Sequence, residues 1–296
     1  MLLYKYSEEP LMTIQPKIKY LTNKDLLLEI HRSKNTYCSY TQPEYADYDI
    51  ILPSLEKINI RTVAEAKRNK AAKLSKEAHQ RAQLTEKKPS AKDYEVDYKK
   101  VAKTDLVFRI ISWEHIPLAP GRKKTVKSTA DSHEKVNFPP FQHWKFDEND
   151  NLICVGKSHW KGGLQNGHFS KDHGRMTDNL ARMFIKLCER YATRGNVRGY
   201  TYNDEMKGQA ILQLTQIGLQ FDESKSNNPF AYYTAAVTNS FVRIINIEKR
   251  NQNIRDDILE MNGMNPSWTR QNSGKDPNAT AVITTLPAAT EWGTDD

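Results

Sequence analysis

Residues 201–222, TYNDEMKGQAILQLTQIGLQFD, are followed by the short polar segment ESKSN and then by residues 228–250, NPFAYYTAAVTNSFVRIINIEKR. The pattern predicts two helices joined by a loop. Asn228 is a suitable N-cap for the second helix, and Pro229 stands at the first helical position, where a missing N–H costs nothing. Apolar residues of this helix recur at spacings of seven, four and three, which predicts one buried face made of Phe230, Val237, Phe241 and Ile244.

The other face of the second helix combines aromatic, amide and guanidinium groups, from Tyr232, Asn239, Arg243, Asn246 and Arg250. Such groups suit stacking on bases, reading of base edges and binding of phosphates. An ordinary solvated surface has the same composition. Helix geometry alone therefore leaves a nucleic-acid surface and a solvated surface both open.

The first helix has an inward apolar face and a polar stripe of glutamines beside it. We expect Met206, Ala210, Leu214, Ile217 and Phe221 to be buried. The stripe contains Gln209, Gln213, Gln216 and Gln220, flanked by Leu212 and Leu219. Glutamines with exposed leucines suit docking to another helix, although simple solvent exposure is the alternative. A further helix begins near Thr177 or Asp178, with Leu180, Phe184, Leu187 and Tyr191 on its buried face.

The order EMKGQAILQLTQIGLQFD, then PFAYYTAAVTNSFVR, resembles the second conserved region of the sigma-70 class of bacterial RNA polymerase sigma factors. The similarity is greatest to the late-transcription sigma factors of T-even-type bacteriophages, including those of cyanobacterial phages. It covers residues 174–260, and KYLTNKDLLLEIHRSK (19–34) resembles the opening of those proteins. The residues between do not match.

The resemblance implies two sets of binding residues. Promoter DNA would be bound by Tyr232, Tyr233, Thr234, Asn239, Arg243, Lys249 and Arg250. Core RNA polymerase would be bound by Lys207, Gln209, Leu212, Gln213 and Gln216. Two departures stand out: Ala235 and Ala236 replace the family's paired tryptophans, and Asn239 replaces a base-reading glutamine. The shorter amide of asparagine still pairs bidentately with adenine.

By this resemblance the chain is a mainly α protein with a sigma region-2-like domain. We expect it to bind the core RNA polymerase of a bacterial host, through the coiled coil of the largest subunit, and to melt a −10-type late promoter. It would not be an enzyme, would need no cofactor, and would act in the cytoplasm of the infected host. A DNA sliding clamp, for which only LPAATEWGTDD is a weak docking match, and a co-activator remain further candidate partners.

The remaining sequence divides the chain into five expected segments. These are an N-terminal helix and loop (1–53), a basic helical and linker segment (54–103), a β-containing insertion (104–173), the sigma-like domain (174–262) and a flexible tail (263–296). Within them we expect a helix over 22–31, loop over 33–53, a long helix over 55–83, linker over 86–103, a strand over 106–113 and a hairpin over 144–155.

Composition is consistent with a polyanionic partner, because the net charge is +8 and the pI is near 9.1. Three widely spaced cysteines imply no disulfide framework, and no apolar run approaches the ~20 residues of a membrane span. We therefore expect a soluble intracellular protein without membrane contact. Translation starts at Met1 or Met12; the sequence does not decide which.

Four residues of types that bind metals, Cys154, His159, His168 and His173, occur at spacings of five, nine and five. Two such pairs joined by a glycine-rich loop suit a tetrahedral zinc site, although the spacing fits no standard zinc finger. A surface loop is the alternative. The runner-up function is accordingly a stand-alone basic nucleic-acid-binding protein with structural zinc, and a metal-dependent nuclease is the enzyme-class rival.

Overall fold

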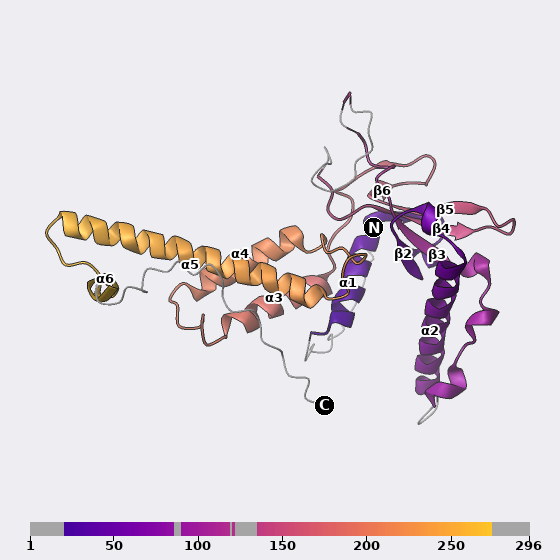
Figure 1. Cartoon of the computed structure of the whole chain (residues 1–296), viewed down its shortest axis with the longest axis horizontal. Coiled ribbons are helices and arrows are strands. Elements are labelled where there is room, and N and C mark those ends of the chain that lie inside the picture. The colour runs from indigo at the N-terminus through magenta and orange to yellow at the C-terminus, as the bar shows by residue number, and fades with distance from the viewer. Residues whose placement is uncertain (1–20, 86–89, 119, 122–134, 274–296) are drawn as a thin grey trace, which may run out of the picture.

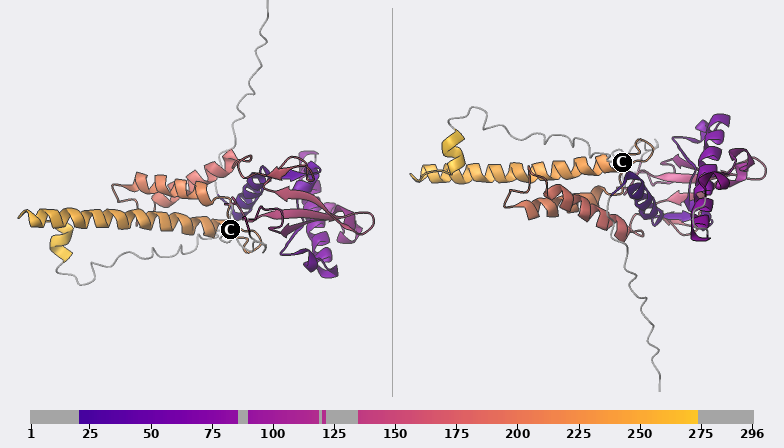
Figure 2. Two further views of the ribbon diagram at one scale, coloured as in Figure 1. Left: turned by 90° about the horizontal axis from the view of Figure 1, so that it is seen from above. Right: turned by 90° about the horizontal axis from the view of Figure 1, so that it is seen from below.

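The computed structural model describes residues 21–85, 90–118, 120–121 and 135–273. A bundle of helices lies at one end of the molecule and a β-sheet at the other, with α1 (Asn23–Asn35) between them (Figures 1 and 2). The bundle contains α3 (Asp178–Ala192), α4 (Asn203–Ile217) and α5 (Pro229–Met261). The described fold therefore combines α and β structure, and the expectation of a mainly α protein with a small β insertion is too simple.

Side-chain caps begin three of the helices where the sequence predicts them. Thr22 Oγ1 accepts from the Asp25 N–H at 3.2 Å, and Thr177 Oγ1 accepts from the Leu180 N–H at 3.3 Å. Asn228 Oδ1 accepts from the Ala231 N–H at 3.0 Å, with Pro229 at the first position of α5. Each cap satisfies a donor that the first turn leaves free, and this fixes where the helix starts.

The bundle core contains the apolar residues that the helical spacing selects. Aromatic rings connect α3 to α5. The ring centroids of Phe184 and Tyr233 are 4.8 Å apart and those of Tyr191 and Phe241 are 4.9 Å apart, and both pairs are T-shaped. Such pairs contribute about 0.5–1.5 kcal/mol beyond the area they bury. The shared core also contains Leu180, Leu187, Met206, Ala210, Leu214, Phe221, Val237 and Ile244.

The five-stranded sheet has the strand order β1-β5-β4-β3-β2. Its strands are β1 (Cys38–Tyr40), β2 (Ile50–Leu52), β3 (Val107–Ile111), β4 (Phe141–Phe146) and β5 (Leu152–Ser158), and β6 (Trp160–Lys161) pairs separately with β7 (His168–Phe169). The predicted strand and hairpin are confirmed as β3 and the β4–β5 pair. The expected loop over 33–53 is wrong, because β1 and β2 from this stretch form both edges of the sheet. Strands β3, β4 and β5 of the expected insertion thus share one sheet with β1 and β2 of the N-terminal segment.

One long helix, α2 (Ile60–Thr85), covers the sheet with a small apolar face around Ala66 and Ala71, which pack on Leu106 and Phe108. It begins five residues later than expected, because residues 55–57 form a short 3₁₀ turn, η2 (Leu55–Lys57). The expected linker after it contains η3 (Ala91–Tyr94), η4 (Tyr98–Lys100) and η5 (Lys103–Asp105). The remaining turn, η1 (Pro43–Ala46), connects β1 to β2.

The described part of the expected tail, residues 263–273, contains one short helix. Helix α6 (Trp268–Ser273) folds back along the end of α5, where Ser267 N–H and Oγ donate to the Asp256 carboxylate at 2.9 and 2.7 Å. The start codon alternatives and the candidate clamp motif lie outside the described residues.

A buried ion pair joins α1 to the loop between α4 and α5. Lys34 Nζ donates to Glu223 Oε2 and to the Phe221 carbonyl, both at 2.6 Å, and its side chain is only 2% exposed. Nearby, the guanidinium of Arg109 from β3 stacks between Tyr48 and Phe141. These contacts fix the loop that leads into α5.

Candidate functional site

A groove of about 400 Å³ runs between α4 and α5. Residues 218–228 join α4 directly to α5, and the two helices pack side by side. The lining comes from Gln209, Leu212, Gln213, Gln216 and Ile217 of α4 and from Ala236, Asn239, Ser240, Arg243 and Ile244 of α5. Four of the residues expected to bind polymerase therefore share one groove with two of those expected to bind DNA.

The glutamine stripe on α4 differs from the prediction at its C-terminal end. Gln209 and Gln216 are exposed and Gln213 is half-buried, and Leu212 is 52% exposed beside them. Leu219, expected to flank the stripe as an exposed leucine, is buried in the core. The reason is that α4 ends at Ile217, after which the chain no longer follows helical spacing.

Lys207 also belongs to the expected polymerase-binding set, and it lies two residues before Gln209, closer to the start of α4. Its Nζ contacts Asp204 Oδ1 at 2.7 Å, and Asp204 is almost completely exposed. An ion pair this exposed holds the lysine only weakly. Lys207 does not line the groove but is available beside it.

The two tyrosines at the start of α5 have different environments. Tyr232 is 36% exposed, with the edge of its ring against Phe221 at 5.6 Å. Tyr233 is buried, its hydroxyl donates to the Gly218 carbonyl at 2.5 Å, and burial raises its pKa. Thr234 is also buried. Tyr233 and Thr234, both expected to contact DNA, therefore have side chains that face the core in this structure.

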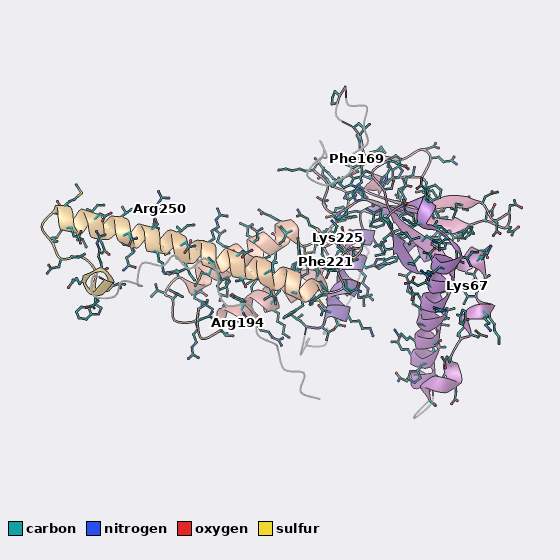
Figure 3. The ribbon with its side chains drawn as sticks, in the orientation of Figure 1. Lys67, Phe169, Arg194, Phe221, Lys225 and Arg250 are labelled. Atoms are coloured by element: carbon teal, nitrogen blue, oxygen red, sulfur yellow. The ribbon has the colours of Figure 1, made fainter. Side chains whose placement is uncertain are left out.

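The remaining residues expected to bind DNA follow one side of α5. Asn239, Arg243 and Arg250 are exposed, and Lys249 is half-buried. Figure 3 shows Arg250 on the part of α5 that extends past α3 and α4, with Phe221 and Lys225 at the opposite end of the helix beside α1. Donor groups are therefore spread along the helix rather than gathered at one point.

Loss of the tyrosine hydroxyl should distinguish the buried ring from the exposed one. We expect Tyr233→Phe to lower the free energy of unfolding by about 1 kcal/mol, because the Gly218 carbonyl loses its buried donor. Tyr232→Phe should change it by less than about 0.5 kcal/mol. Urea unfolding followed by circular dichroism measures both, and equal effects would contradict the assignment of the two environments.

The four proposed zinc ligands do not form a metal site. Among the described residues, no three His, Cys, Asp or Glu side chains converge to hold an ion. Cys154 Sγ contacts the Gly156 carbonyl at 3.5 Å, and His168 is exposed on β7. His159 is buried with its ring 4.1 Å from that of Phe138, and burial lowers its pKa to about 3. Cys154, His159, His168 and His173 are therefore not gathered into one ligand set in this structure.

Sequence reasoning missed Ala236 and Ser240 as lining residues of the groove. The sequence marks Ala236 only as a departure from the family, which has tryptophan at this position. Both are small residues on the same side of α5 as Asn239 and Arg243, and helical spacing from those two would have selected them. Their small size leaves the groove open beside the glutamines.

Comparisons with known proteins found no matching family model, no matching curated protein and no matching solved structure. Within the ranges that the structure describes, none of the helices has both the length and the apolar character needed to span a bilayer.

Proposed function

We propose that this chain is a sigma-like initiation factor that binds the core RNA polymerase of a bacterial host and recognises and melts a −10-type late promoter. The observation that carries the proposal is the groove between α4 and α5, where Gln209, Gln213 and Gln216 lie beside Asn239 and Arg243. This adjacency supports simultaneous binding of a protein helix and of DNA by one helical hairpin.

On the α4 side, the chemistry suits a helical partner. Leu212 is an exposed apolar residue among glutamines, and amide side chains both donate and accept hydrogen bonds. An interface of this kind buries an apolar centre and pairs polar groups around it. The partner that the sequence resemblance implies is the coiled coil of the polymerase's largest subunit.

On the α5 side, three kinds of contact combine. Tyr232 offers a partly exposed ring for stacking on an unpaired base, and Asn239 offers an amide that pairs with adenine. Arg243, Lys249 and Arg250 supply cations for phosphates, which set the register of the protein on DNA. The polymerase makes the bonds of the RNA chain, so this chain itself is not an enzyme. It acts in the cytoplasm of the infected host. A sliding clamp and a co-activator are candidate additional partners.

Co-purification with core polymerase, followed by transcription from a template with only a −10 element, tests the proposal. We expect stoichiometric binding and transcripts that begin downstream of the element. A stand-alone nucleic-acid-binding protein would retain DNA but not the polymerase. Nicking of plasmid DNA in the presence of a divalent metal would instead identify a nuclease.

Promoter melting should depend on the ring of Tyr232. Stacking contributes about 1–3 kcal/mol per base, so Tyr232→Ala should reduce opening of a duplex promoter by about 5- to 150-fold while polymerase binding stays intact. Permanganate reactivity of unpaired thymines measures opening. Tyr232→Phe keeps the ring and is the matched control, and normal opening by the alanine variant would contradict this role.

A further inference from the structure

The far half of α5 carries an apolar stripe that no described residue covers. The helix extends past α3 and α4, as Figure 1 shows, and four of its large apolar side chains remain exposed along this length. They are Ile247, Ile254, Ile258 and Met261, the last 86% exposed. Their spacings of seven, four and three place all four on one face of the helix.

The opposite face of the same segment is covered. Asp256 is buried beneath Ser267, which donates to both of its carboxylate oxygens, and Gln252 Nε2 donates to Ser267 Oγ at 3.1 Å. Asp256 lies two positions from both Ile254 and Ile258, about 160–200° around the helix. The residues that lead into α6 therefore occupy one side and leave the apolar stripe on the other side open.

Three of the four residues of the stripe are spaced symmetrically about Ile254, whereas Ile258, four residues after it, has Arg250 at the equivalent position before it. Ile247 lies seven residues before it and Met261 seven residues after it. If a second α5 runs in the opposite direction with its Ile254 against the first, each Ile247 meets the Met261 of the other helix. A seven-residue apolar repeat is the pattern by which two helices pack along a shared seam.

Charges beside the stripe have the same symmetry. Arg250 and Asp257 lie on the same flank, four residues before and three residues after Ile254. In the antiparallel arrangement Arg250 of each helix faces Asp257 of the other, whereas a parallel arrangement opposes arginine to arginine and aspartate to aspartate. Arg270 already donates to Asp257 Oδ1, and a carboxylate has a second oxygen that can accept from another guanidinium.

We propose that two copies of this chain associate through α5 in an antiparallel pair centred on Ile254. The interface comprises the apolar stripe at its centre and two Arg250–Asp257 ion pairs at its flank. The exposed Met264 and Trp268 lie just past the end of the stripe, where the helical bundle of the second copy would approach. This pairing goes beyond the function proposed above and shares Arg250 with it, so each Arg250 either pairs with Asp257 of the second copy or binds a phosphate.

Light scattering on the full chain after size-exclusion chromatography tests the association. We expect the wild type to have twice the mass of one chain, which is 34.1 kDa, and Ile254→Glu to have the mass of one chain. Ile185→Glu, at an exposed isoleucine on α3, is the matched control and should stay paired. A wild type at the single mass at every concentration, or a paired Ile254→Glu, would overturn the proposal.

A charge exchange keeps the test decisive if Ile254→Glu does not fold. Arg250→Glu should give the mass of a single chain, because in both ion pairs the new carboxylate then faces the carboxylate of Asp257. Arg250→Glu combined with Asp257→Arg should restore the doubled mass. If the combined variant stays single while its circular dichroism matches that of the wild type, the ion-pair register is wrong.

Disulfide formation distinguishes the two orientations. In a background with Cys38→Ser and Cys154→Ser, Ile247→Cys and Met261→Cys are prepared separately, one of them carrying a size tag, and mixed under mild oxidation. We expect the mixed disulfide to exceed either self-linked product. Dominant self-linkage of each variant would show a parallel pair and overturn the antiparallel one.

Discussion

Replacement of Lys34 by methionine is expected to lower the free energy of unfolding by about 3–5 kcal/mol, the range for removal of one partner of a buried ion pair. The lysine side chain is 2% exposed and that of Glu223 is 11% exposed, so water does not replace the lost ammonium. Methionine fills a similar volume, which limits any effect of an empty cavity. Urea unfolding followed by far-ultraviolet circular dichroism measures the change.

The chain offers two matched controls for this variant. Lys225 contacts Asp222 at 3.3 Å in the same loop but is 82% exposed, so Lys225→Met should change stability by no more than about 0.5 kcal/mol. Lys34→Met combined with Glu223→Gln removes both charges and should recover much of the loss. Equal effects of Lys34→Met and Lys225→Met would show that burial does not set the strength of the pair.

The loss caused by Lys34→Met should also depend on pH. Burial alone raises the pKa of Glu223, but the charges of Lys34 and Arg109 outweigh burial and hold the pKa below its ordinary value of 4.5. A depressed carboxyl pKa stabilises the fold above the unfolded-state value, and this stabilisation is lost as the pH falls through the folded-state value. The difference between wild type and Lys34→Met should therefore shrink below about pH 4.5. A difference that stays constant down to pH 3 would contradict this linkage.

Local sequence signals predicted the helices well because caps and helical spacing act within a few residues. Thr22, Thr177 and Asn228 each begin a helix as expected. The two edge strands were missed because β1 and β2 contain three residues each, too few to show alternation. They exist because β5 and β3, more than fifty residues away in sequence, pair with them.

The candidate site was predicted in part. Helical spacing put Gln209, Gln213 and Gln216 on one side of α4 and Asn239 and Arg243 on one side of α5, and both sets line the groove. The assignment of Tyr233 came from the family resemblance, which does not show which of two adjacent rings points inward. Its hydroxyl reaches Gly218, and the position of that carbonyl depends on how the loop folds after α4 ends.

Charge placed on the glutamine stripe should prevent binding of core RNA polymerase without unfolding the chain. Gln209 is exposed and Gln213 is half-buried at the groove, whereas Met206, Ala210 and Leu214 of the same helix are buried in the core. Substitutions on the groove side should therefore change stability by no more than about 0.5 kcal/mol. A charge left unpaired in an interface costs about 2–5 kcal/mol, which weakens binding at least about 30-fold.

We therefore expect Gln209→Glu combined with Gln213→Glu to keep the circular dichroism spectrum and melting temperature of the wild type and to lose co-purification with the polymerase. Gln220→Glu is the matched control, because Gln220 is exposed past the end of α4 and does not line the groove. Wild-type affinity of the double variant would place the docking surface elsewhere or contradict the sigma-like function. Unfolding of the double variant would instead contradict the assignment of the two faces of α4, since only a residue that packs in the core should destabilise the bundle when it acquires a charge.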